Sequence, residues 1–167
     1  WMDTRIPLRS IALGDLDNNA LPELLAPSNT SGIVSFSGSS DRSISYSGRI
    51  PYQYNDTNNP ITQIEAIDLN KDQLTDIVVM GTYGIHVYLR TTNGGLGMPL
   101  SFSTEPDLIR YVSMFRIGDL NGDSIPDIVV ADPLGKFAAM IGVGDGSFLA
   151  PTFTQTDSDP SRFVIAD

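Results

Sequence analysis

Short runs of aliphatic and β-branched residues recur along the chain, and each directly follows a polar stretch. Residues 128–131 (Ile-Val-Val-Ala), 77–79 (Ile-Val-Val) and 24–26 (Leu-Leu-Ala) follow three stretches rich in Asp and Asn. Bounded apolar runs of this length and composition are typical of buried strands, since a helix shows a longer periodic segment. The pattern therefore predicts a buried strand after each polar stretch.

Further strands are predicted on both sides of these runs. A leading strand is expected at residues 6–14, 61–67 and 112–118, and a third strand at residues 32–36, 84–89 and 136–141. Glycine-rich turns typical of hairpins come next, at residues 37–41, 93–99 and 142–151. A polar outer strand follows, as at residues 100–104 and 152–156, and we find no convincing helix. Each unit thus contains four strands.

The polar stretches share one spacing of oxygen-bearing side chains. Residues 119–127 read Asp-Leu-Asn-Gly-Asp-Ser-Ile-Pro-Asp, with such side chains at the first, third, fifth and ninth positions, and residues 15–23 and 68–76 repeat the arrangement. The loops start at residues 15, 68 and 119, which gives periods of 53 and 51. A near-constant period of this size indicates a repeat architecture. Residues 163–167 resemble residues 115–119 and predict the start of a fourth repeat.

Four strands per unit of about fifty residues is the composition of a propeller blade. We therefore expect an all-β chain of about three four-stranded antiparallel β-propeller blades. The approximate repeats are residues 6–55, 60–106 and 111–157, and the fourth starts at residues 161–167. Because propellers usually close with four to eight blades, we expect this segment to continue into further blades or to assemble with other copies.

The loops are built to surround a hard cation. In the calcium interpretation, side chains at positions one, three and five, the main-chain carbonyl at position seven and the side chain at position nine supply oxygen ligands. The seventh side chain is then expected to face the core. These ligands are Asp15, Asp17, Asn19, Leu21 and Glu23 in the first loop; Asp68, Asn70, Asp72, Leu74 and Asp76 in the second; and Asp119, Asn121, Asp123, Ile125 and Asp127 in the third.

Oxygen-only ligands favour Ca²⁺ over zinc or copper, and a shell of this size suits it better than Mg²⁺. We expect about one Ca²⁺ per repeat, three in all. An EF-hand is not expected, because strands flank the loops and position twelve is Ala26, Val79 or Val130 instead of Glu. Ordinary turns remain the alternative, since Asp, Asn and Gly dominate turns. If ions do bind, they either stabilise the fold or mediate ligand contact.

The loop pattern followed by an apolar run, and the Gly-Asp-Gly-Ser-Phe-Leu-Ala-Pro turn at residues 144–151, resemble the FG-GAP and VCBS repeats. These repeats occur in calcium-binding β-propellers, including integrin α-subunit heads. The third repeat matches best, and the second keeps the turn without its Asp and Phe. The first departs most, because Asn19 and Glu23 stand at positions five and nine and the Gly-Asp-Gly turn is missing. The resemblance implies the propeller fold and Ca²⁺ sites.

Composition narrows the function classes. The formal net charge of −10 argues against nucleic acid as a partner, and no apolar run is long enough to span a membrane. The chain has no cysteine, so disulfides and thiolate metal sites are excluded. Ca²⁺ sites of moderate affinity are occupied at extracellular calcium concentrations but are empty in a resting cytosol. The predicted sites therefore favour an extracellular or cell-surface location. The sequons at Asn29 and Asn55 fit such a location.

No catalytic residue is assigned. His86, the single histidine, lies in an alternating segment and is expected to be a solvent-facing or satisfied strand residue. We expect a non-enzymatic, calcium-stabilised scaffold for protein or glycan binding or adhesion, with an unknown ligand. The alternatives are an accessory or catalytic part of a secreted carbohydrate-active enzyme and a purely structural module of a surface assembly.

Overall fold

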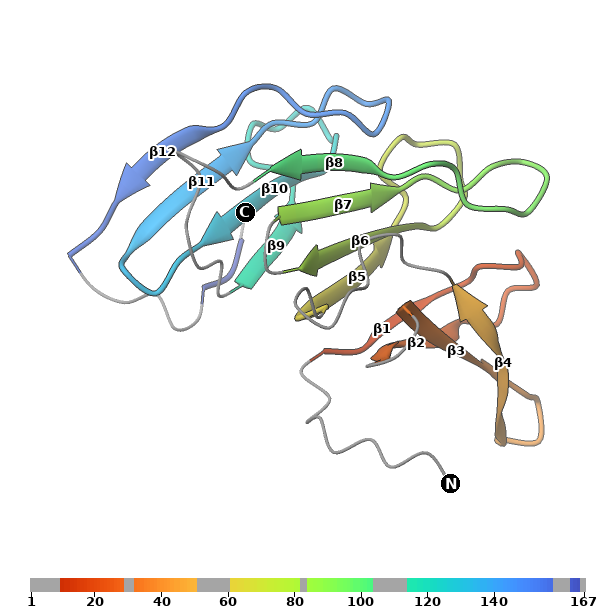
Figure 1. Ribbon diagram of the computed structural model, residues 1–167. Coiled ribbons are helices and arrows are strands. Elements are labelled where there is room, and N and C mark those ends of the chain that lie inside the picture. The colour runs from red at the N-terminus through yellow and green to blue at the C-terminus, as the bar shows by residue number, and fades with distance from the viewer. Residues whose placement is uncertain are drawn as a thin grey trace.

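The computed structural model describes residues 10–28, 32–50, 61–81, 84–103, 114–157 and 163–165, and these contain twelve strands and no helix (Figure 1). Accordingly, no helix in these ranges has the length and apolar character to cross a membrane. The strands are β1 (Ala12–Gly14), β2 (Glu23–Ser28), β3 (Gly32–Gly38), β4 (Ile44–Ile50), β5 (Gln63–Ile67), β6 (Asp76–Gly81), β7 (Gly84–Tyr88), β8 (Leu100–Ser103), β9 (Met114–Gly118), β10 (Asp127–Ala131), β11 (Lys136–Met140) and β12 (Thr152–Gln155).

The strands form three four-stranded antiparallel sheets, each built from consecutive segments of the chain. The first sheet has the order β1-β2-β3-β4, the second β5-β6-β7-β8 and the third β9-β10-β11-β12. The expected all-β class is therefore confirmed. The three apolar runs fall in β2, β6 and β10, the second strand of each sheet.

The second sheet lies between the first and the third and contributes to both hydrophobic cores. All six residues of β6 are buried. Because alternate side chains of a strand point to opposite faces, Ile77 and Val79 join the core shared with the first sheet, whereas Val78 and Met80 join the core shared with the third. This two-sided burial explains why residues 77–80 form a continuous apolar run.

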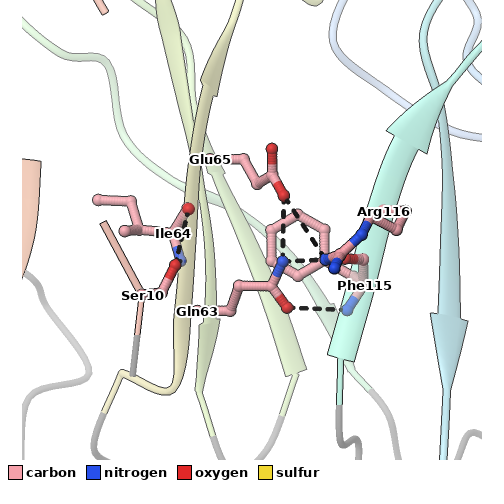
Figure 2. Close-up of polar contacts among 6 residues, drawn as sticks. All are labelled: Ser10, Gln63, Ile64, Glu65, Phe115 and Arg116. Atoms are coloured by element: carbon pink, nitrogen blue, oxygen red, sulfur yellow. Dashed lines mark hydrogen bonds and ion pairs between the residues drawn. The ribbon is translucent and has the colours of Figure 1, made fainter. Parts of the chain in front are cut away.

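The inner strands β1, β5 and β9 are linked by side-chain bridges from one repeat to the next. The amide of Gln63 donates to the carbonyl of Phe115 at 2.9 Å and accepts from its N–H at 3.0 Å (Figure 2). The Ser10 hydroxyl makes the equivalent contacts with the main chain of Ile64, both at 3.2 Å. Each bridge satisfies main-chain groups on the edge of the following sheet.

The outer face of the third sheet is contacted by the next segment of chain. The Phe163 ring packs edge-on against Phe137, with centroids 5.4 Å apart. Ile165 lies so close to Gly118 that a Cβ on this glycine would approach its side chain to 2.9 Å. Of the predicted fourth repeat, only residues 163–165 are described, and the sequons at Asn29 and Asn55 lie outside the described residues.

Candidate metal centre

The three acidic loops occupy equivalent places, because each joins the inner strand of its sheet to the second strand. Each passes through two residues with positive φ, at the fourth and sixth positions. These residues are Asn18 and Ala20 (φ 62° and 67°), Lys71 and Gln73 (62° and 68°), and Gly122 and Ser124 (80° and 65°). The loops are therefore one structural motif in spite of their different residues.

Main-chain N–H groups of each loop donate to its first-position carboxylate. The two Asp15 oxygens accept from Asn19 and Ala20 at 3.1 and 2.7 Å, and Asp68 makes the corresponding two bonds. Asp119 accepts from the sixth residue in the same way, but its other oxygen accepts from Gly122, the fourth residue. The fifth side chain accepts from the seventh N–H, as at 2.7 Å between Asp123 and Ile125. These are bonds of Asx turns, so they agree with ordinary turns as well as with a preorganised cation loop.

The ninth residue differs between the loops. Asp76 and Asp127 are completely buried, and both oxygens of each accept main-chain N–H groups. One oxygen accepts from the second loop residue, Leu69 or Leu120, at 2.9 or 2.8 Å. The other accepts at 2.8 Å from a residue just beyond the third strand, Arg90 or Gly142. These aspartates therefore fasten their loop to the far end of the third strand.

Glu23 of the first loop has an oxygen without such a partner. Its Oε2 accepts from the N–H of Leu16 at 2.7 Å, but Oε1 is buried and has no hydrogen-bond partner. The side chain is only 4% exposed. Burying a carboxylate oxygen without a partner is costly, so a cation or a hydrogen-bond donor at this place would stabilise it.

Asp15 and Asp17 bring two more carboxylates to the same place. One oxygen from each and one from Glu23 all lie within 4.8 Å of one another, the one such trio of His, Cys, Asp or Glu side chains in the described parts of the chain. Three carboxylates, one with a buried unpaired oxygen, fit a hard divalent cation such as Ca²⁺. The loop that departs most from the repeat pattern thus has the most convergent carboxylates.

The seventh residues do not all face the core. Leu21 is 43% exposed, so the expectation that this side chain faces the core is wrong for the first loop. Leu74 and Ile125 are half-buried. The ligand role of their three carbonyls stays a prediction.

Two carboxyl groups of the acidic loops have shifted pKa values. Burial raises the pKa of Asp76, and the nearby charges of Asp72 and Asp68 raise it further, against the N–H groups of Arg90 and Leu69. Partial desolvation acts to raise the pKa of Asp119, but four main-chain N–H groups of its own loop outweigh it and lower the value. The repulsion around Asp76 is the kind that a bound cation relieves.

Arg90 connects the first two loops. Besides its main-chain bond to Asp76, its Nη1 donates to the carbonyl of Asp15 at 3.1 Å, and the side chain is only 7% exposed. Sequence reasoning missed this residue. The sequence gives a weak hint of its main-chain bond to Asp76, because Arg90 and Gly142 follow the closing aspartate of their loops by nearly the same interval. Nothing in the sequence indicates that the guanidinium contacts Asp15, which lies 75 residues earlier in the chain.

His86 is a buried residue of strand β7 and is not solvent-facing. It is 5% exposed, and its Nδ1 lies 3.0 Å from the Ser101 hydroxyl on the neighbouring strand. Burial lowers the pKa of His86 to about 4. A general base works best with a pKa near the operating pH, so this histidine suits that role poorly at neutral pH.

The segment containing the second and third loops matches a known repeat. Residues 68–130 match the family model described as the FG-GAP-like repeat. Over these residues, the chain is similar to FG-GAP-like repeat proteins. The predicted FG-GAP resemblance is thereby confirmed, and the match begins at Asp68, after the first loop.

The chain is similar to a solved structure over most of its length. The Tc holotoxin pore of Photorhabdus luminescens aligns with a TM-score of 0.51 and 14% identity over 90% of this chain. At this identity the likeness concerns the fold alone, and the chain spans 8% of the length of that toxin chain. A search of curated protein sequences found no match. The three sheets and the FG-GAP-like repeat make the chain a β-propeller-like module.

Proposed function

We propose that this chain is an extracellular or cell-surface, calcium-stabilised scaffold that binds a protein or glycan ligand without catalysing a reaction. The observation that carries the calcium role is the buried, unpaired Oε1 of Glu23 beside the carboxylates of Asp15 and Asp17. A divalent cation would neutralise this cluster and hold β1 to β2. The equivalent loops at residues 68–76 and 119–127 are proposed as further sites, giving about one Ca²⁺ per repeat.

The scaffold role is supported by the chemistry of the side chains. The one histidine is buried with a low pKa, and the first-position carboxylates of the loops accept hydrogen bonds from their own main chain. The extracellular location follows from the calcium role, because loops of moderate affinity stay empty at resting cytosolic calcium.

Calorimetry and thermal unfolding of Glu23→Gln test the calcium role, with Glu65→Gln on strand β5 as the control. In calcium, the unaltered protein should show about three binding sites and a higher melting temperature than in chelator. Saturation at a free concentration of 100 times Kd contributes about 2.7 kcal/mol per site. The Glu23→Gln variant should lose the first-loop site.

The two conditions should give opposite results for Glu23→Gln. In chelator this variant should be at least as stable as the unaltered protein, because it no longer buries an unpaired charge. In calcium it should be less stable, whereas Glu65→Gln should follow the unaltered protein in both. Absence of binding heat together with no effect of chelator would refute the calcium role. Turnover by the purified chain on a polysaccharide panel would refute the non-catalytic role.

A further inference from the structure

A pocket of about 380 Å³ lies between the first and second repeats. Its wall includes Leu16, Arg49 and Ile50 from the first repeat, and Tyr88, Arg90 and Leu96 from the second. This volume is in the range of small-molecule sites. The pocket adjoins the core shared by the first two sheets, because Leu16, Ile50 and Leu96 pack against that core.

The Arg90 guanidinium gives the pocket a buried positive charge. Arginine remains protonated in proteins, so burial does not remove this charge. Nη1 donates to the Asp15 carbonyl, whereas Nε is buried and has no hydrogen-bond partner. Among the described residues, no carboxylate pairs with Arg90. A buried guanidinium whose one side-chain bond is to a neutral carbonyl is poorly compensated.

The remaining donors of Arg90 match one chemical group. With Nη1 occupied and Nε enclosed by protein atoms, Nη2 is the guanidinium nitrogen left for a ligand in the pocket. Its N–H groups can form a charge-assisted hydrogen bond with a carboxylate oxygen. Arg49, an exposed residue at the end of β4, adds a second positive charge to the wall. The other side chains on the wall are largely apolar and suit a compact apolar body attached to the carboxylate.

We propose that this pocket binds a small organic carboxylate with an apolar body, held by the Arg90 guanidinium. The inference names a ligand class for the binding role proposed above and in that respect rests on it. Leu16 belongs to the first acidic loop, and Asp15 accepts from Arg90, so the pocket and the loop share a wall. A cation in that loop lowers the negative charge beside the pocket. Calcium and the carboxylate therefore strengthen each other's binding.

N-acetyl-leucine serves as the probe, because it joins a carboxylate to an apolar side chain. N-acetyl-leucinamide is its uncharged control, and glucuronate is a carboxylate without the apolar body. Titration by NMR in calcium should show saturable shifts of the Arg90 Nε–H and of the Leu16 and Leu96 amides. N-acetyl-leucine should bind about tenfold more tightly than either control, because the amide lacks the charge-assisted hydrogen bond and glucuronate lacks the apolar contact.

Arg90→Met should weaken N-acetyl-leucine binding at least tenfold, while Arg116→Met, a half-exposed arginine on β9, should leave it unchanged. Equal binding of the amide, equal binding of glucuronate, or no shift at Arg90 would each overturn the assignment. The shifts are measured in the unaltered protein, so they decide the matter even if Arg90→Met fails to fold.

Repeating the titration in chelator separates the two proposals. Weaker binding in chelator supports the coupling between loop and pocket. A calcium-dependent melting temperature without any carboxylate binding would overturn the pocket and leave the calcium scaffold intact. Carboxylate binding without any effect of calcium would support the pocket and refute its coupling to the first loop.

Discussion

Five of the six residues with positive φ in the acidic loops carry a side chain, although only glycine adopts this conformation without strain. Gly122 is the exception, and its equivalents are Asn18 and Lys71. The loop geometry is therefore imposed by its hydrogen bonds to the first-position carboxylate, and it is retained even where the local residue disfavours it. Strain at single residues is part of how these loops are built.

Ala20→Gly should stabilise the protein by about 0.5–1 kcal/mol. The left-handed conformation costs an L-residue about 1–2 kcal/mol, and glycine removes this cost. The greater conformational freedom of glycine in the unfolded chain offsets only part of the stability gained. Ala150 is also exposed but lacks positive φ, so Ala150→Gly should instead lose a few tenths of a kcal/mol. Urea denaturation measures both changes. A loss of stability in both variants would contradict the assigned strain.

His86 should make stability depend on pH. Its pKa is about 4 in the folded protein and near 6.5 when unfolded, so the unfolded state binds more protons between these values. The stability is present above pH 6.5 and is lost as the pH falls toward 4, by about 3 kcal/mol in total. The Ser101 hydroxyl on the neighbouring strand faces the Nδ1 of His86.

His86→Gln keeps a hydrogen-bonding side chain that does not titrate. The difference in unfolding free energy between the unaltered protein and this variant should shrink as the pH is lowered from 7 to 4.5. Denaturant titration at several pH values at constant calcium measures this difference. The loop carboxylates titrate alike in both proteins and cancel, so parallel curves would contradict the role of burial at His86.

At the scale of elements, the inner strands are linked by side chains at one position of the repeat. Ser10 and Gln63 are equivalent, and their main-chain partners Ile64 and Phe115 are equivalent as well. The third repeat has Met114 at this position, which offers no comparable donor. The sequence repeat shows the alignment of these positions, but their contact across sheets appears only once the strands are in place.

Gln63→Leu should destabilise the protein by about 1–3 kcal/mol, because it leaves the N–H of Phe115 without a partner and removes one of the two donors to its carbonyl, the other being Arg116 Nη1. Gln63→Glu keeps the acceptor for the Phe115 N–H but removes the donor and places a second carboxylate beside Glu65, so it should also be less stable than the unaltered protein. Thermal unfolding ranks the three proteins. Equal stability of the leucine variant and the unaltered protein would show that the bridge contributes nothing.

At the scale of the whole molecule, the second sheet joins the other two by sharing a separate core with each. Leu25 belongs to the core of the first and second sheets, and Ile128 to the core of the second and third. In such a stacked array, stability is approximately a sum of repeat and nearest-neighbour terms. A destabilising substitution in one core should therefore affect mainly the sheets that share this core.

Leu25→Ala should cost about 2–5 kcal/mol and raise hydrogen exchange mainly in β1–β4. Strands β9–β12 should keep their protection, and Ile128→Ala should give the reverse pattern. Hydrogen exchange followed by mass spectrometry reports each sheet separately. A uniform loss of protection in all three sheets would show instead that the molecule unfolds as one cooperative unit.

The sequence by itself determined the strands, the repeat and the place of the acidic loops. Alternation and β-branched runs are local properties of the chain, and carboxylates spaced over nine residues remain in one loop whatever surrounds it. For this reason the all-β class, with four antiparallel strands per sheet, and the FG-GAP resemblance could be predicted, and both are confirmed.

Only the tertiary structure decided which of these groups are buried and what they contact. The sequence ranked the first loop as the most divergent, yet packing leaves the Glu23 Oε1 unpaired there, whereas Asp76 and Asp127 meet main-chain donors from beyond the third strand. Arg90 reaches Asp15 across 75 residues of sequence. The burial of these side chains and their hydrogen-bond partners depend on how one sheet packs against the next, so no local sequence pattern encodes them.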